Sequence, residues 1–247
     1  MANGVRWVGH STVLVELDGV RLLTDPLLRE RVVMLRRSEP LDLESLEDLD
    51  AVLISHVHYD HLDLGSLRKL QGAKALVMPR GAASLVRRRL SAPVHELGAG
   101  ETVEIGSLTV QAVPAEHDSS RLLGKKTEAL GYVVSGSKRL YFLGDTDLFP
   151  ALAEVAPDTD VALVPIWGWG PSLGTGHLDP RRAAEAVALI RPRVAVPIHW
   201  GTYYPVTVRK SAREFLRKPV AEFAEAAAEL APAVEVRVLP VGGSLEL

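Results

Sequence analysis

The chain has 247 residues, 47% of them hydrophobic, which is enough to bury a large core. Its 28 lysines and arginines against 31 aspartates and glutamates give a formal charge of −3, so no nucleic-acid partner is expected. Cysteine is absent, which excludes disulfides and thiolate metal sites, so any metal must bind to imidazole and carboxylate groups.

The amino terminus lacks a basic segment followed by an apolar one, and no run approaches 18 consecutive apolar residues. These patterns predict a cytoplasmic protein with neither a secretory signal nor a transmembrane segment. The sequence leaves the oligomeric state open, and a homo-oligomer is one of the options.

The first segments predict a hairpin followed by a helix and a strand. Residues 12–17 and 20–24 have strand character on either side of Asp18-Gly19, a two-residue turn signal. The polar residues 39–50 predict a short surface helix, and an apolar strand begins at residue 51.

Later segments predict alternating helices and strands. Helices are expected at residues 64–70, 82–90 and 180–191, with a C-terminal helical region that Pro219 divides. Strands are expected at residues 75–78, 132–134, 139–143, 161–164, 193–198 and 234–238, and as two runs within residues 102–113. Asp179 and Pro180 suit the N-cap and the first position of their helix.

Hairpins followed by alternating helix and strand occur twice along the chain. This order favours two sheets with helices outside them over a doubly wound parallel sheet. We expect a single domain, residues 1–247, built from two pseudo-equivalent halves at about residues 1–125 and 126–247.

A dense cluster of potential metal ligands follows the apolar run at residues 51–54. His56, His58, Asp60 and His61 fall within six positions. Burying so many polar side chains together without a metal or other partners would be costly. The cluster therefore predicts metal binding.

Three further candidates each follow a predicted strand: His117, Asp145 and His199. A lone histidine at such a place is more often a hydrogen-bonded structural residue than a ligand. Strand ends converge on one edge of a sheet, however, and the combined set exceeds what one tetrahedral zinc takes. The set suits two adjacent ions bridged by Asp145 and a water molecule.

The pattern His-x-His-x-Asp-His, a later histidine, Gly-Asp-Thr and a final histidine resembles the ligand pattern of the metallo-β-lactamase superfamily. The resemblance implies an α/β (α+β) fold, a four-layer αββα sandwich of two mixed sheets. It also implies the metal ligands: one ion on His56, His58 and His117, a second on Asp60, His61 and His199, and Asp145 between them. Asp25 matches an early aspartate that supports the site from behind the ligands.

Shorter motifs give a narrower resemblance. Residues 7–16, 23–26, 177–180 and 197–202 look like phospholipase D enzymes that hydrolyse N-acylphosphatidylethanolamines, and ascorbate-6-phosphate lactonases belong to the same branch. The resemblance implies that His177 approaches the substrate from a helix start, a place suited to an anion. Lipid specificity stays open, because the loop at residues 166–171 is particular to this chain.

The expected activity is therefore metal-dependent hydrolysis by a hydroxide that bridges two divalent ions. The substrate is a small or lipid-like phosphodiester, or alternatively a lactone or carboxylic ester. Asp60, His177 and Asp25 are the expected catalytic residues, with His177 orienting the substrate or protonating the leaving group. Zinc is the first choice for such ligands, with manganese and iron as alternatives.

Two rival classes have weaker support. A diiron oxygen- or nitric-oxide-reducing domain would have a glutamate in place of His58 and usually a flavin domain. A non-enzymatic binding module should have lost ligands, and none is missing from the pattern.

The roles of two groups of residues stay open. Arg121, Lys125 and Lys126 suit either a phosphate site or a solvated loop. Trp167 and Trp169 suit either the wall of an apolar pocket or a cover over the core.

Overall fold

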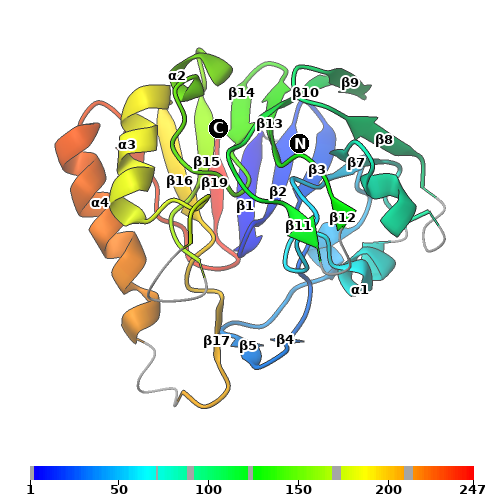
Figure 1. Ribbon diagram of the computed structural model, residues 1–247, viewed down its shortest axis with the longest axis horizontal. Helices are drawn as coiled ribbons and strands as arrows, with labels where there is room; N and C mark the ends of the chain where they lie inside the picture. Colours follow the sequence, from blue (N-terminus) through cyan, green and yellow to red (C-terminus); the bar gives the residue numbers. More distant parts are fainter. Residues whose placement is uncertain (1–2, 71, 88–91, 122–124, 169–173, 209–213) are drawn as a thin grey trace.

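A computed structural model of the chain describes residues 3–70, 72–87, 92–121, 125–168, 174–208 and 214–247. Two seven-stranded mixed sheets form the centre of the molecule, and helices lie outside them (Figure 1). The predicted αββα architecture is confirmed. The division of the chain into two equivalent halves stays a prediction.

The first sheet has the strand order β19 (Ser244–Glu246), β1 (Gly4–Gly9), β2 (Thr12–Leu17), β3 (Val20–Thr24), β6 (Ala51–Leu53), β7 (Leu76–Pro79), β8 (Val94–Leu97). Its first four strands are antiparallel, and β2 and β3 form the predicted hairpin around Asp18-Gly19. From β3 to β8 the strands are parallel. Their carboxyl ends therefore lie at the same edge.

The second sheet has the order β18 (Glu235–Val236), β16 (Val194–Ile198), β15 (Val161–Pro165), β14 (Arg139–Phe142), β13 (Leu130–Ser135), β10 (Leu108–Pro114), β9 (Thr102–Ile105). Strands β14, β15, β16 and β18 are parallel. Strand β10 runs in the same direction as β14, because each is antiparallel to β13. The carboxyl ends of β10, β14 and β16 therefore share one edge.

Alternating side chains of the first sheet belong to two different cores. In β6, Ala51 and Leu53 belong to the core between the sheets, whereas Val52 and the following Ile54 belong to the core on the outer face. Successive residues of a strand point to opposite faces. A strand covered on both faces is therefore apolar throughout, which explains the uninterrupted run that ends at the histidine cluster.

Helices cover the outer faces of both sheets. Helices α2 (Leu152–Val155), α3 (Pro180–Ile190) and α4 (Lys218–Leu230) lie over the second sheet (Figure 1). The side chain of Asp179 caps α3 by accepting the backbone N–H of Arg182, as the sequence predicted. The first sheet is covered by α1 (Leu64–Leu67) and the 3₁₀ turns η1 (Glu44–Leu46), η2 (Arg68–Leu70) and η3 (Ala82–Leu85).

Several expected elements are shorter than predicted. Residues 39–50 contain only η1, because aspartates are poor helix formers and Asp48 has a left-handed φ of 53°. The helix expected at residues 82–90 is only η3, and residues 88–90 lie outside the described part. The C-terminal strand is reduced to the two residues that pair with β16.

Short elements complete the described chain: β11 (Ser120–Arg121), β12 (Lys125–Lys126), η5 (Glu214–Leu216) and a three-stranded sheet of β4 (Arg31–Val32), β5 (Leu35–Arg37) and β17 (Tyr203–Pro205). Pro219 stands in the first turn of α4, where its missing N–H is not needed. None of the described helices is both long enough and apolar enough to cross a membrane.

Candidate metal centre

The fold brings the predicted site residues to one edge of the sandwich. Asp25 and the histidine cluster follow the parallel strands β3 and β6 of the first sheet. His117, Asp145 and His199 follow β10, β14 and β16 of the second sheet. Residues scattered over the sequence meet there because every one of these strands ends at this edge.

The first group of candidate ligands consists of His56, His58 and His117. Nδ1 of His58 lies 3.1 Å from Nε2 of His56 and 3.1 Å from Nε2 of His117. Ring nitrogens this close together can share one ion at metal–nitrogen distances of about 2.0–2.1 Å.

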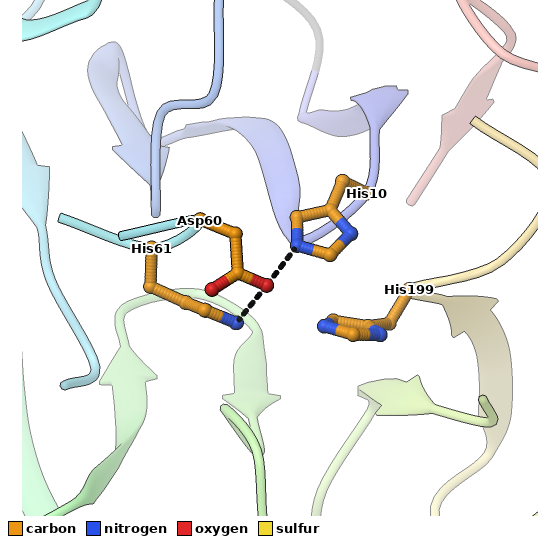
Figure 2. Close-up of side chains that lie close together, drawn as sticks. All are labelled: His10, Asp60, His61 and His199. Carbon is orange, nitrogen blue, oxygen red and sulfur yellow. Dashed lines mark hydrogen bonds and ion pairs between the residues drawn. The ribbon is translucent and has the colours of Figure 1, made fainter. Parts of the chain in front are cut away.

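The second group consists of His10, Asp60, His61 and His199 (Figure 2). Asp60 lies between two of the rings, with Oδ2 accepting a hydrogen bond of 3.1 Å from Nε2 of His10 and lying 3.6 Å from Nε2 of His61. The rings of His10 and His199 are in contact, with centroids 4.0 Å apart and planes tilted by 41°. The predicted ligands Asp60, His61 and His199 are therefore together, and His10 joins them.

Asp145 lies between the two groups. Its Oδ2 is 3.3 Å from Nε2 of His61 and 3.4 Å from Nε2 of His199. Asp145 also forms a group of possible ligands with His117 and His177. Nε2 of His177 lies 3.7 Å from Oδ2 of Asp145. The buried Oδ1 of Asp145 has no hydrogen-bond partner among the described residues. A buried carboxylate oxygen left this way is suited to a cation.

Oxygen atoms behind the rings orient four of the histidines. The outer nitrogen Nδ1 of each ring lies at hydrogen-bond distance from an oxygen: His56 to Ser55 Oγ at 2.9 Å, His61 to Asp25 Oδ2 at 2.7 Å, His117 to the Gly176 carbonyl at 2.7 Å and His199 to the Trp167 carbonyl at 2.6 Å. A ring that donates its Nδ1–H keeps the lone pair on Nε2, which faces the centre. These residues fit metal ions.

The electrostatics of the two groups differ. Burial lowers the pKa of His56 well below its usual value, and it also lowers the pKa of His58 and His117. These rings are therefore neutral, the form that binds metals. Burial also opposes the charge of His61, but Asp145 and the other carboxylates outweigh it and raise the pKa of His61 well above normal. The carboxylates of Asp145, Asp60 and Asp25 thus favour a positive charge at this place, which a metal cation would also supply.

Unusual backbone conformations occur at this edge. Asp25, His199 and His10 have positive φ angles of 31°, 64° and 54°. Such conformations cost energy for residues other than glycine and occur often at functional sites. Gly144, before Asp145, also has a positive φ of 64°, and a Cβ there would lie 2.8 Å from the Leu130 carbonyl. Glycine is therefore required where the chain turns into the site.

Sequence reasoning missed the role of a buried network around Asp147. Oδ2 of Asp147 accepts hydrogen bonds from the Gly176 backbone N–H at 3.2 Å and from Arg182 at 3.1 Å. The Gly176 carbonyl in turn accepts from His117. Asp147 thus holds the segment that orients a candidate ligand. No spacing rule singles it out, because its partners lie about 30 residues further along the chain.

Sequence reasoning also gave His10 no definite role, although it lies in a short motif. In the structure His10 is buried, and burial together with His199 lowers its pKa to about 3. Neutral His10 donates its Nε2–H to Asp60. Its position directly after β1 was the available signal, since the predicted ligands also follow strands.

A large cavity opens beside this centre. It measures about 1090 Å³ and is lined by residues that include Trp167, His177, Arg182 and Tyr203. That volume lies at the upper end of the range for small-molecule sites. Trp167 lines this cavity and also packs against the core, so it has features of both expectations, while Trp169 lies outside the described residues.

The basic residues that suit either a phosphate site or a solvated loop are only partly described. Lys126 forms an exposed ion pair with Asp118 at 3.3 Å. Arg121 and Lys125 pair through the backbone strands β11 and β12. Both interpretations of these residues, a phosphate site and a solvated loop, stay open.

The architecture and the clustered histidine and aspartate ligands are those of a metal-dependent hydrolase of the metallo-β-lactamase fold. A family model described as a β-lactamase superfamily domain matches residues 20–200. The chain belongs to this superfamily.

Relatives agree with this assignment. A UPF0173 metal-dependent hydrolase of Methanopyrus kandleri is 34% identical over 98% of this chain and 99% of its own. An N-acyl-phosphatidylethanolamine-hydrolyzing phospholipase D 1 of Caenorhabditis elegans is 33% identical over 80% of this chain, which spans only 63% of that relative. Igni18, a metallo hydrolase of Ignicoccus hospitalis, has a similar fold with a TM-score of 0.74 at 24% identity, covering 100% of this chain and 99% of its own.

Asp25→Asn should weaken metal binding about tenfold to a hundredfold, because Oδ2 of Asp25 accepts the Nδ1–H that orients His61. Titration against a chromophoric chelator measures this change. Asp63→Asn is the control, since Asp63 is also a buried aspartate but caps α1. Equal metal affinity in Asp25→Asn and the wild type would show that Asp25 does not orient a ligand.

Proposed function

We propose that the chain is a dinuclear hydrolase of phosphodiesters, with phospholipid-like diesters among its substrates. The observation that supports this most is the place of Asp145 between two groups of ligand atoms, with His177 beside it. Two metals held this way suit an in-line displacement at phosphorus. The name of the C. elegans relative, a phospholipase D, favours the same substrate class.

In this proposal His56, His58 and His117 hold the first ion, Asp60, His61 and His199 hold the second, and Asp145 contacts both. Zinc is the proposed metal because imidazole nitrogens dominate the set, with manganese and iron as alternatives. When bound, two such ions lower the pKa of a water molecule and neutralise charge on the substrate. Asp25 and the backbone carbonyls of Gly176 and Trp167 keep the rings aligned.

His177 is the proposed general acid. Its side chain is partly exposed to the cavity, with Nε2 directed at Asp145. Water adds to phosphorus and one ester P–O bond breaks, which leaves a monoester and an alkoxide. Nε2 of His177 gives its proton to the alkoxide, and the proton released by the attacking water restores the imidazolium.

His177→Ala should keep the full metal content but lower kcat by about 10²-fold or more, because it removes the proton donor and none of the seven ligands. The effect should shrink for a substrate with an acidic leaving group such as p-nitrophenol, which departs without a proton. Unchanged kcat with both acidic and alkyl leaving groups would leave His177 with a structural role only.

The substrate class is tested by comparing bis(p-nitrophenyl) phosphate with a panel of lactones and carboxylic esters. The protein is loaded with zinc or with manganese, and His58→Ala gives the background. We expect phosphodiester turnover above that background and above lactone turnover. Lactone or ester turnover without phosphodiester turnover would replace this substrate class with the alternative one.

A further inference from the structure

The small sheet of β4, β5 and β17 lies apart from the layered body, at the lower end of Figure 1. Its β4–β5 hairpin turns at Val33 and Met34, whose exposed fractions are 93% and 61%. The Met34 carbonyl accepts the backbone N–H of Val206, which is 40% exposed. These three side chains form an apolar tip, called here the hairpin tip.

Val33 is unfavourable at this position for two reasons. Its apolar side chain is almost fully exposed, and its φ of 50° is left-handed, a conformation that β-branched residues very rarely adopt. Glycine or asparagine normally occupies such a hairpin turn. An exposed residue that is unfavourable for both solvation and backbone conformation is a candidate for contact with an apolar partner.

The base of the hairpin is basic. Arg31 and Arg36 face each other across β4 and β5, and both are exposed. Like charges directly opposite each other destabilise a strand pair. No carboxylate among the described residues forms an ion pair with either arginine within 4.0 Å, so both charges are available to an anion.

The hairpin also borders the cavity beside the metal centre. Leu35 of β5 and Tyr203 and Pro205 of β17 line the cavity that His177 and Trp167 also line. The cavity therefore extends from the small sheet to the metal centre, with Leu35 and Pro205 on its wall at the end beside the small sheet.

We propose that the hairpin tip docks on the surface of an anionic phospholipid bilayer. The tip enters the boundary between headgroups and acyl chains, and Arg31 and Arg36 bind headgroup phosphates. An apolar tip with basic residues at its base suits such a surface, because the apolar side chains enter the bilayer boundary while the basic ones meet the anionic headgroups. A second copy of the chain fits less well. A stable interface buries roughly 800 Å² on each partner, and three side chains cover much less surface than that.

Docking of the hairpin tip does not depend on the metal chemistry. Only its consequence, the passage of a lipid-like substrate along the cavity to His177, rests on the proposed function. Docking is therefore measured as binding, without turnover.

The test is co-sedimentation of the metal-loaded full chain with vesicles of phosphatidylcholine alone or mixed with phosphatidylglycerol. We expect binding that rises with phosphatidylglycerol and falls with salt. Val33→Gly with Met34→Ser should lower partitioning about tenfold or more, because it removes two of the three apolar side chains of the tip. The same change relieves the left-handed valine, so the hairpin should stay folded. Arg31→Gln with Arg36→Gln should abolish the dependence on phosphatidylglycerol.

Leu189→Ser is the matched control, because Leu189 is also an exposed apolar residue, at 43%, but lies on α3. It should bind vesicles as the wild type does, and every variant should keep the wild-type metal content. No binding by the wild type, or equal binding by the hairpin variants, would refute the proposal. So would concentration-dependent self-association that the Val33→Gly, Met34→Ser variant abolishes, because it would assign the tip to a second copy.

Discussion

Asp145→Ala is expected to bind about half as much metal as the wild type and to lose phosphodiester turnover by at least about 100-fold. Oδ2 of Asp145 lies 3.3 Å and 3.4 Å from two rings of the second group, and the same residue also belongs with His117. Removing it takes away the shared ligand. Loss of a residue that only hydrogen-bonds to a metal ligand lowers metal affinity or activity about 10–100-fold. Loss of a ligand itself should therefore lower activity by at least about 100-fold.

The control for this variant is Asp118→Ala, which removes an exposed carboxylate whose partners among the described residues include Ser120 and Lys126. It should keep both the metal and the activity, as judged by elemental analysis and initial rates. An Asp145→Ala protein that is folded, fully metallated and active would exclude a bridging role for Asp145.

His58→Ala is expected to lose the ion of the first group and with it all turnover above background, a fall of at least about 100-fold. His58 is the central member of that group, because its Nδ1 is 3.1 Å from both other rings. Only His56, His117 and the shared Asp145 would remain to hold the ion. Free imidazole, which can occupy the space left by the side chain, should restore part of the activity.

His95→Ala is the matched control, since His95 lies on β8 and belongs to none of the described histidine–carboxylate groups. It should leave metal content and rates at wild-type values. Turnover by metal-free His58→Ala at the wild-type rate would refute a metal-dependent reaction at this place.

The sequence was sufficient to predict which candidate ligands converge, because these residues follow a local rule. His56, His58, Asp60 and His61 are adjacent in the chain, and the distant ligands each follow an apolar strand. Strands of this kind end at a common edge, so the convergence of His117, Asp145 and His199 follows from the fold class alone. The structure adds the distances and the identity of the facing atoms.

The parts that sequence reasoning missed depend on tertiary contacts. Asp147 acts through a backbone N–H about 30 residues away, and His10 contacts Asp60 across 50 residues. Neither contact leaves a periodic pattern. The unpredicted strand β19 exists because Val5 pairs with Leu245 at the other end of the chain. The exposed Val33 breaks local preferences, so no propensity rule would have placed it in a turn.

The central claim is that two metal ions bind to each chain and share Asp145. Elemental analysis of the fully loaded wild type, combined with anomalous scattering from its crystals, tests this claim most directly. The account predicts two ions per chain, one surrounded by His56, His58 and His117 and the other by Asp60, His61 and His199. A single ion per chain at saturating metal, or ions bound away from these residues, would contradict it.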